Sequence, residues 1–245
     1  MTYAKPKIRL HVTAPLGPEA DVVLAKEQAH YLGNVMRQRP GDRVLVFNGI
    51  DGEWVVEIAT LGKRGAVLTC LDQNRPQSQP PDLWLCFAPI KKTRTDFIAE
   101  KACEMGCRRL VPVLTRYTNS ERVRTERLTA HAIEAAEQCG LVSVPEVVEP
   151  VTLERLLADW PADRALMFCD ESGTAPPAQE VLRAAGPGPW AVLIGPEGGF
   201  APEEAEWLRA LASAHPISLG PRILRADTAA VAALTVWQSV LGDWR

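Results

Sequence analysis

Short apolar runs alternate with helical stretches along most of the chain, and no other feature constrains the possible folds as strongly. The runs span residues 83–90, 108–114, 164–169, 190–195 and 216–220. Apolar runs of this length, separated by helices, are typical of parallel strands joined by crossover helices. The sequence therefore predicts an α/β domain built on a parallel sheet.

Two of the intervening helices have a clear apolar side. The first covers residues 95–105, ends at Gly106 and has its apolar residues at Ile98, Ala102 and Met105. The second ends at Gly140 and has its apolar residues at Leu128, Ala132, Ala135 and Cys139. In both, a glycine directly after the helix supplies the usual C-terminal stop.

The last helix, from about residue 228 to 241, is apolar around nearly its whole circumference. Such a helix must be covered on more than one side. The sheet can cover one face, so we expect a second subunit to cover another, which predicts a homodimer.

The first part of the chain follows a different pattern. Four runs that alternate or are continuously apolar, at 7–12, 42–49, 53–61 and 65–71, are separated by turn signals and indicate strands. One helix is expected within 27–42, with Tyr31, Val35 and Met36 on its apolar face and Pro40-Gly41 at its end. These elements predict a small β-barrel over residues 1–73. The Pro/Gln-rich segment 72–82 separates it from a second domain over 82–245.

Charge is distributed unevenly. The net charge is −3, yet residues 1–127 carry 20 lysines and arginines against 14 acidic residues, and residues 128–245 carry 7 against 16. A basic half within an acidic chain suggests a polyanionic partner, although surface charge without a partner explains any single cluster equally well. The basic clusters are Arg37, Arg39 and Arg43; Lys91, Lys92 and Arg94; and Arg116, Arg122, Arg124 and Arg127.

Several classes of protein are not expected. The six cysteines form no CxxC pair, so we expect neither a disulfide framework nor a metal site, and we interpret Cys103 and Cys107 as buried thiols. No segment approaches the roughly 18 apolar residues that cross a bilayer, and the N-terminus has no apolar signal region. We therefore expect a cytoplasmic protein without a membrane partner.

Two glycine-containing loops are the candidate functional motifs. IGPEGGF (194–200) follows an apolar run and precedes a helix, but it matches neither common nucleotide-binding glycine pattern. LGPRILRADTA (219–229) also joins a strand to a helix. Both loops would lie at carboxyl ends of parallel strands and line one crevice. Glycines allow the backbone to approach a ligand closely.

The two motifs together resemble those of the bacterial RNA uridine-N3 methyltransferases of the RsmE type, in the knotted SPOUT superfamily. The resemblance extends over the chain, through HYLGNVMRQRPGD (30–42), the segment 91–121 and AIEAAEQCGLVSVPEV (132–147).

The resemblance implies a SPOUT-type parallel sheet with a C-terminal trefoil knot, preceded by a PUA-like RNA-binding barrel. It also implies a homodimer that binds S-adenosylmethionine and methylates uridine N3 in the decoding region of small-subunit ribosomal RNA, free or in the assembled subunit. The residues implied to bind S-adenosylmethionine are Phe168, Cys169, Asp170, Ile194, Gly195, Pro196, Glu197, Gly198, Gly199, Leu219, Gly220, Pro221, Arg222, Ile223 and Leu224.

The reaction requires loss of the uridine N3 proton, so the site needs a base or a cation that stabilises the resulting anion. Arg225 is the first choice to stabilise the anion or to hold the adjacent phosphate, because its guanidinium stays charged and offers planar forked donors. Glu197 and Asp227 are the candidate bases. Asp227 stands where the family usually has Glu, and it is also a plausible helix N-cap. The residues predicted to bind RNA are Arg37, Arg39, Arg94 and Arg116.

Two alternatives remain open. One is an enzyme of the same superfamily that acts on another RNA, such as transfer RNA, or on a ribose hydroxyl. The other is a non-catalytic RNA-binding or ribosome-assembly protein that retains the knot.

Overall fold

The computed structural model describes residues 6–119, 122–170 and 175–244, and the chain divides into two compact units. Unit 1 comprises residues 1–79 with 136–144, and unit 2 comprises residues 80–135 with 145–245. Each unit has its own core and is described by itself.

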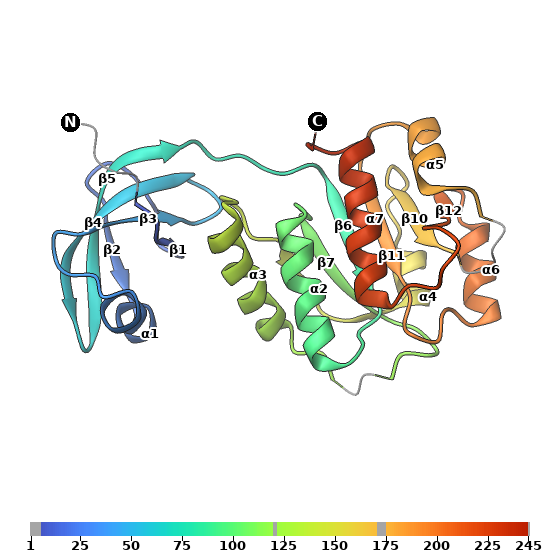
Figure 1. Ribbon diagram of the computed structural model, residues 1–245, viewed down its shortest axis with the longest axis horizontal. Coiled ribbons are helices and arrows are strands. Elements are labelled where there is room, and N and C mark those ends of the chain that lie inside the picture. Colours follow the sequence, from blue (N-terminus) through green and yellow to red (C-terminus); the bar gives the residue numbers. More distant parts are fainter. Residues whose placement is uncertain (1–5, 120–121, 171–174, 245) are drawn as a thin grey trace. The chain divides into compact units, whose positions relative to one another are not determined.

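Unit 1 contains a five-stranded sheet with the order β1-β3-β4-β5-β2 (Figure 1). Its elements are β1 (Arg9–His11), β2 (Asp21–Leu24), α1 (Lys26–His30), the π-helix η1 (Tyr31–Val35), β3 (Arg43–Phe47), β4 (Glu53–Gly62) and β5 (Gly65–Arg75). The four strand runs predicted from the sequence are confirmed. β2, a strand of four residues, was not predicted.

The apolar face predicted for the first helix is wrong. Tyr31 and Val35 are exposed, whereas Ala29 and Leu32 are buried in the core of this unit. The helix changes from α to π geometry at Tyr31 and ends at Val35, before Pro40-Gly41. Because a π turn holds more residues than an α turn, side chains after His30 leave the face that the 3.6-residue period predicts.

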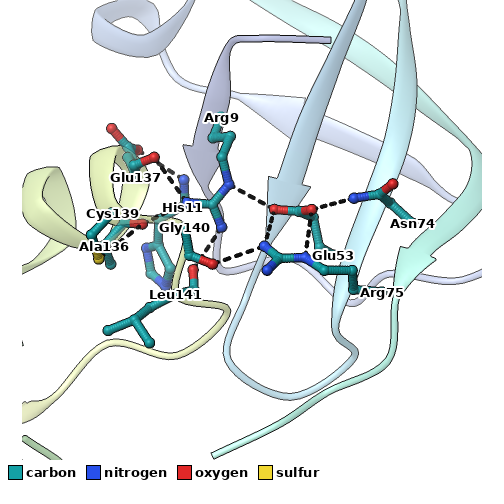
Figure 2. A network of polar contacts seen from close by, with 10 residues as sticks. All are labelled: Arg9, His11, Glu53, Asn74, Arg75, Ala136, Glu137, Cys139, Gly140 and Leu141. Atoms are coloured by element: carbon teal, nitrogen blue, oxygen red, sulfur yellow. Dashed lines mark hydrogen bonds and ion pairs between the residues drawn. The ribbon is translucent and has the colours of Figure 1, made fainter. Parts of the chain in front are cut away.

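A buried glutamate organises the polar interior of unit 1 (Figure 2). Glu53, on β4, is 1% exposed and accepts hydrogen bonds from Arg9 (2.6 Å), Arg75 (2.8 and 3.0 Å) and Asn74. Arg9 also donates to the carbonyls of Ala136, Glu137 and Leu141, at 2.5 to 2.8 Å. Burial raises the pKa of Glu53, but the hydrogen bonds from Arg75, Arg9 and Asn74 together outweigh it, so the pKa is lowered.

Unit 2 is built on a parallel sheet with the order β12-β10-β11-β6-β7-β8, with β9 paired to β7. Its strands are β6 (Leu83–Phe87), β7 (Arg109–Leu114), β8 (Glu146–Val147), β9 (Val151–Thr152), β10 (Ala165–Cys169), β11 (Trp190–Ile194) and β12 (Ala214–Ile217). The helices are α2 (Lys92–Glu104), α3 (Thr125–Cys139), α4 (Leu153–Ala158), α5 (Ala178–Ala185), α6 (Pro202–Ala210) and α7 (Ala226–Val240). The predicted parallel α/β fold is confirmed.

Both faces of this sheet are covered because successive residues of each strand point to opposite sides. On one face, Leu85 and Val192 pack with residues of α2, α5 and α7. On the other, Cys86 and Leu193 pack with residues of α4 and α6. The strands are therefore apolar at nearly every position, as is typical of a parallel sheet.

In unit 2, the predicted helix patterns hold with one exception. Ile98 and Ala102 are buried, and Gly106 ends α2 with φ +73°. Cys139 is exposed, so the prediction that it lies on the apolar face is wrong; the last turn of α3 buries Ala136 instead. Cys103 and Cys107 are buried thiols, as predicted, and burial raises the pKa of the Cys107 thiol.

Candidate active site

The IGPEGGF loop leaves the sheet at the carboxyl end of β11, whose five residues are all buried. Two of its three glycines, Gly195 and Gly199, stand where the backbone or a neighbouring ring disfavours a side chain. Gly199 has φ +69° and its N–H donates to the Pro196 carbonyl at 3.0 Å, which closes a tight turn. A Cβ at Gly195 would lie 3.1 Å from the ring of Phe200, which folds back over the loop. The loop thus exposes backbone at the point where α6 begins.

The second glycine-containing loop leaves the carboxyl end of β12 and leads into α7. Gly220 has φ +111° within this loop. β10 lies between β12 and β11 in the sheet, so the two loops flank the end of β10 at Cys169 and Asp170. Crevices at the carboxyl ends of parallel strands are the usual ligand sites of such sheets, and the predicted meeting of the two loops is confirmed.

Two adjoining pockets occupy this end of the sheet. The larger, of about 440 Å³, is lined by Cys169, Asp170, Ile217, Ser218, Leu219, Gly220, Pro221, Arg222, Ile223, Leu224 and Ala229. The smaller, of about 170 Å³, is lined by Cys169, Ile194, Gly195, Pro196, Glu197, Gly199, Phe200, Ile223, Leu224, Arg225, Ala226 and Ala229. They share Cys169, Ile223, Leu224 and Ala229, so together they form one site.

Most residues predicted to bind S-adenosylmethionine line this site, and two do not. Phe168 is buried in the core with Leu193. Gly198 lies in the loop beside the smaller pocket, where a Cβ would be 3.5 Å from the Cβ of Tyr117. Asp170 pairs with Arg209 at 3.1 Å.

The charged groups predicted to act in catalysis have different surroundings. Arg225 and Glu197 are exposed and line the smaller pocket, and neither side chain bonds to any residue in the described part of the chain. Asp227 lies outside both pockets and forms an ion pair with Arg94 of α2, with 3.5 Å between Oδ2 and Nη1. Arg94, predicted to bind RNA, is thereby placed beside the first turn of α7.

The prediction that Asp227 caps α7 is wrong. The N-cap is Arg225, whose carbonyl accepts the Ala229 N–H at 2.7 Å, so the helix begins at Ala226. Asp227 is the second residue of the helix, and its carboxylate accepts the N–H of Thr228 at 2.9 Å.

Glu204, which was not singled out from the sequence, links the start of α6 to the segment that follows β7. The residue is 6% exposed, and its carboxylate accepts the backbone N–H of Ala201 at 2.9 Å and that of Arg116 at 2.8 Å. Arg116, predicted to bind RNA, is thus fixed next to the glycine loop with its side chain exposed. A glutamate three residues after a helix N-cap is a weak capping signal when the N-cap is alanine, which explains why Glu204 was missed.

Arg37 and Arg39, the other residues predicted to bind RNA, lie in unit 1 and are exposed. Arg37 has φ +55°, a left-handed conformation that is uncommon outside glycine. The Arg39 N–H donates to the carboxylate of Asp42 at 2.7 Å. Their role in RNA binding stays a prediction.

Known proteins resemble the chain over nearly its whole length. Residues 77–238 match an RNA methyltransferase domain, and residues 24–70 match an RNA methyltransferase PUA domain. A ribosomal RNA small subunit methyltransferase E from Rickettsia conorii is 29% identical, with 92% of this chain and 93% of that protein covered. The protein of the same name from Synechocystis sp. is 31% identical, with 91% and 74% covered.

Solved structures agree with these similarities. A Legionella pneumophila chain described as a methyltransferase, solved with bound S-adenosylmethionine, is 26% identical with a TM-score of 0.88, covering 96% of this chain and 98% of that one. A ribosomal RNA small subunit methyltransferase E from Neisseria gonorrhoeae is 24% identical with a TM-score of 0.89, covering 97% and 99%, and supports the fold. The match to the methyltransferase domain spans more than half of the sequence, and from it we conclude that this chain belongs to the RNA methyltransferase family that carries an N-terminal PUA domain.

Proposed function

We propose that the chain transfers the methyl group of S-adenosylmethionine to N3 of a uridine in the decoding region of small-subunit ribosomal RNA. The observation that carries this proposal is the meeting of the two glycine-containing loops in one site that also holds Arg225 and Glu197. Relatives similar over nearly the whole chain are ribosomal RNA small subunit methyltransferases by name. The resemblance of both motifs to the RsmE type supports uridine N3 as the acceptor.

The site fits S-adenosylmethionine. The larger pocket alone has a volume typical of small-ligand sites, which run from about 300 to 1,000 Å³, and it combines apolar walls with backbone polar groups. Gly195 and Gly199 line the smaller pocket with bare backbone, since a Cβ at Gly195 would crowd the Phe200 ring and Gly199 has φ +69°. A structural neighbour with 26% identity holds the same molecule. When bound, S-adenosylmethionine supplies a methyl carbon activated by its sulfonium.

The chain's own groups must then bind the uridine, accept its N3 proton and stabilise the resulting negative charge. Arg225 would stabilise the negative charge that develops on the base as the N3 proton leaves, because it is a permanent cation exposed at the smaller pocket. We assign acceptance of the proton to Glu197, which shares that pocket, rather than to Asp227, whose carboxylate is engaged by Arg94.

The quaternary structure belongs to the same proposal. We infer a homodimer because apolar residues of the α7 region remain uncovered: Ile223 is 90% exposed, and Val231 and Val236 are half-buried. The knot predicted for the C-terminal segment is also inferred, since the strand order sends the chain from β11 past β10 to β12 before α7.

No helix in the described ranges is long and apolar enough to cross a membrane. A ribosomal substrate implies that the protein acts in the cytoplasm, on free RNA or on the assembled subunit.

The test is transfer of labelled methyl from S-adenosylmethionine to small ribosomal subunits that lack the modification, with naked ribosomal RNA in parallel. Nucleoside mass spectrometry identifies the product, and we expect 3-methyluridine. A methylated ribose or another methylated base would contradict the proposal in favour of a different methyltransferase of this superfamily. Binding of S-adenosylmethionine without any transfer would support a non-catalytic RNA-binding protein.

A further inference from the structure

Unit 2 has a second concave site, separate from the two glycine-containing loops. We call it the basic pocket: a cavity of about 430 Å³ where α2 and α3 begin. Among the described residues, its lining includes five cationic side chains and one acidic side chain. The cations are Lys91, Lys92, Arg122, Arg124 and Arg127, and the acid is Asp96.

Asp96 does not neutralise the cations of the described lining. Asp96 is 6% exposed, and Arg127 holds both of its carboxylate oxygens, at 2.8 and 2.6 Å. The hydrogen bond from Arg127 lowers the pKa of Asp96, so the pair stays ionised with no net charge. The other four cations remain exposed, and none forms a side-chain hydrogen bond or ion pair within the described ranges.

The backbone adds to the positive potential and fixes the shape. α2 has thirteen residues and begins at the pocket lining, and its N-cap, Lys91, makes no side-chain capping bond, so the positive end of the helix dipole is not offset by a capping side chain. The Thr95 hydroxyl bonds to both the N–H and the carbonyl of Ile90, each at 3.0 Å, and thereby closes the turn that carries Lys91 and Lys92. The backbone that carries these two lysines is therefore fixed before any ligand arrives.

The basic pocket adjoins the candidate active site through α2 and α7, which lie side by side (Figure 1). Arg94, two residues after Lys92, pairs with Asp227, two residues after Arg225. An RNA strand with its target base near Arg225 could therefore continue along the start of α2 with its phosphates over the basic pocket.

We propose that the basic pocket binds the phosphates of the RNA strand next to the methylated uridine. This inference rests on the proposed function for the identity of the RNA. Several exposed cations spread over one cavity match a chain of phosphates better than a single small anion. The pocket would hold the strand in register without reading its sequence.

The test compares two double variants that remove the same charge. Arg122→Ala with Arg124→Ala removes two cations that have no structural partner among the described residues. The control, Arg155→Ala with Arg183→Ala, removes two exposed arginines from α4 and α5 of the same unit. Affinity for purified small-subunit ribosomal RNA is measured over a series of salt concentrations, together with affinity for S-adenosylmethionine.

We expect the Arg122/Arg124 variant to bind the RNA about tenfold more weakly at low salt. The slope of log affinity against log salt should fall by about 1.4, since each contact to a single strand contributes about 0.7. Affinity for S-adenosylmethionine should not change, and the KM for RNA should rise while kcat at saturating RNA is kept. The control should match the wild type in every measurement.

An unchanged salt slope in the Arg122/Arg124 variant, or an equal fall in the control, would overturn the proposal. The two proposals fail separately. If the wild type transfers no methyl group but the Arg122/Arg124 variant alone loses RNA affinity, the basic pocket stands and the proposed reaction fails. If 3-methyluridine forms and the salt slope is unchanged, the reaction stands and the basic pocket fails.

Discussion

Gly198 lies where one side-chain atom fits and a larger side chain does not. A Cβ there would be 3.5 Å from the Cβ of Tyr117, an ordinary contact, whereas the branched side chain of valine needs space that Tyr117 occupies. We expect Gly198→Val to displace the glycine loop and to weaken binding of S-adenosylmethionine at least about tenfold. Gly198→Ala is the matched control and should bind almost normally in calorimetry. Equal affinities for the two variants would show that the loop tolerates the added bulk.

Substitution of Arg225 should distinguish binding of the methyl donor from the chemical step. Its side chain is exposed at the smaller pocket without a bonded neighbour among the described residues, so removing it should leave the fold intact. We expect Arg225→Ala to bind S-adenosylmethionine almost normally and to lose turnover by about 10²-fold or more, the usual cost of a lost stabilising donor. Arg225→Lys should recover part of the rate because it restores the charge without the planar fork. A variant that loses only donor affinity would show that Arg225 binds the donor instead.

The two candidate bases can be distinguished by removing each charge while keeping the size of the side chain. We expect Glu197→Gln to lower turnover by about 10²-fold or more, as for a lost general base. Asp227→Asn should cost far less, because its ion pair with Arg94 is partly exposed and such pairs contribute about 0 to 1 kcal/mol. Single-turnover methyl transfer with both substrates saturating measures the difference. The reverse order of effects would transfer the role of base to Asp227.

At the scale of elements, strand β4 carries two glutamates in ion pairs, the buried Glu53 and the partly exposed Glu57, and only Glu53 should contribute strongly to stability. Glu53 is enclosed by Arg9 and Arg75 (Figure 2), whereas Glu57 faces Arg43 at 3.7 Å on the surface. We expect Glu53→Gln to lower the free energy of unfolding by about 3 kcal/mol near neutral pH, because it leaves two cations facing an uncharged amide. Glu57→Gln is the matched control and should cost less than about 1 kcal/mol.

The effect of Glu53 should also depend on pH in a defined direction. Its pKa is lower in the folded state than the ordinary value of 4.5, so the stabilisation is fully present above about pH 4.5 and is lost as the pH falls through the folded-state pKa. Chemical denaturation between pH 3 and 7 should show the wild type and Glu53→Gln converging at the acidic end. A constant difference at every pH would mean that packing, and not charge, makes the contribution.

At the scale of the whole molecule, the uncovered apolar residues near α7 predict self-association. Ile223 is 90% exposed at the edge of the candidate active site, so a partner that covers it would also help to enclose that site. We expect dilute-solution scattering to give the mass of a dimer, and Ile223→Asp to weaken both dimer formation and methyl transfer. The exposed Ile50, in unit 1, provides a control as Ile50→Asp, which should change neither. A wild-type monomer that still methylates RNA would contradict the shared site.

The sequence by itself determined the features that depend on neighbouring residues. The strands of the parallel sheet, the stop at Gly106 and the two glycine-containing loops were predictable because apolar periodicity and turn chemistry act over a few residues. The same local signals placed Arg225 and Glu197 on loops that a parallel sheet must bring together. The resemblance of the two motifs to a known family then indicated the ligand and the reaction.

Only the tertiary structure decided the features that join distant residues or depend on a single turn of helix. The π-helix turns Tyr31 and Val35 outward against the local period, and residues 136–144 pack with unit 1 although they follow unit 2 residues in the chain. Glu204 with Arg116 and Arg94 with Asp227 are separated by about ninety or more positions. Such pairs form because the fold brings their groups within bonding distance, and no local pattern records which distant group will arrive.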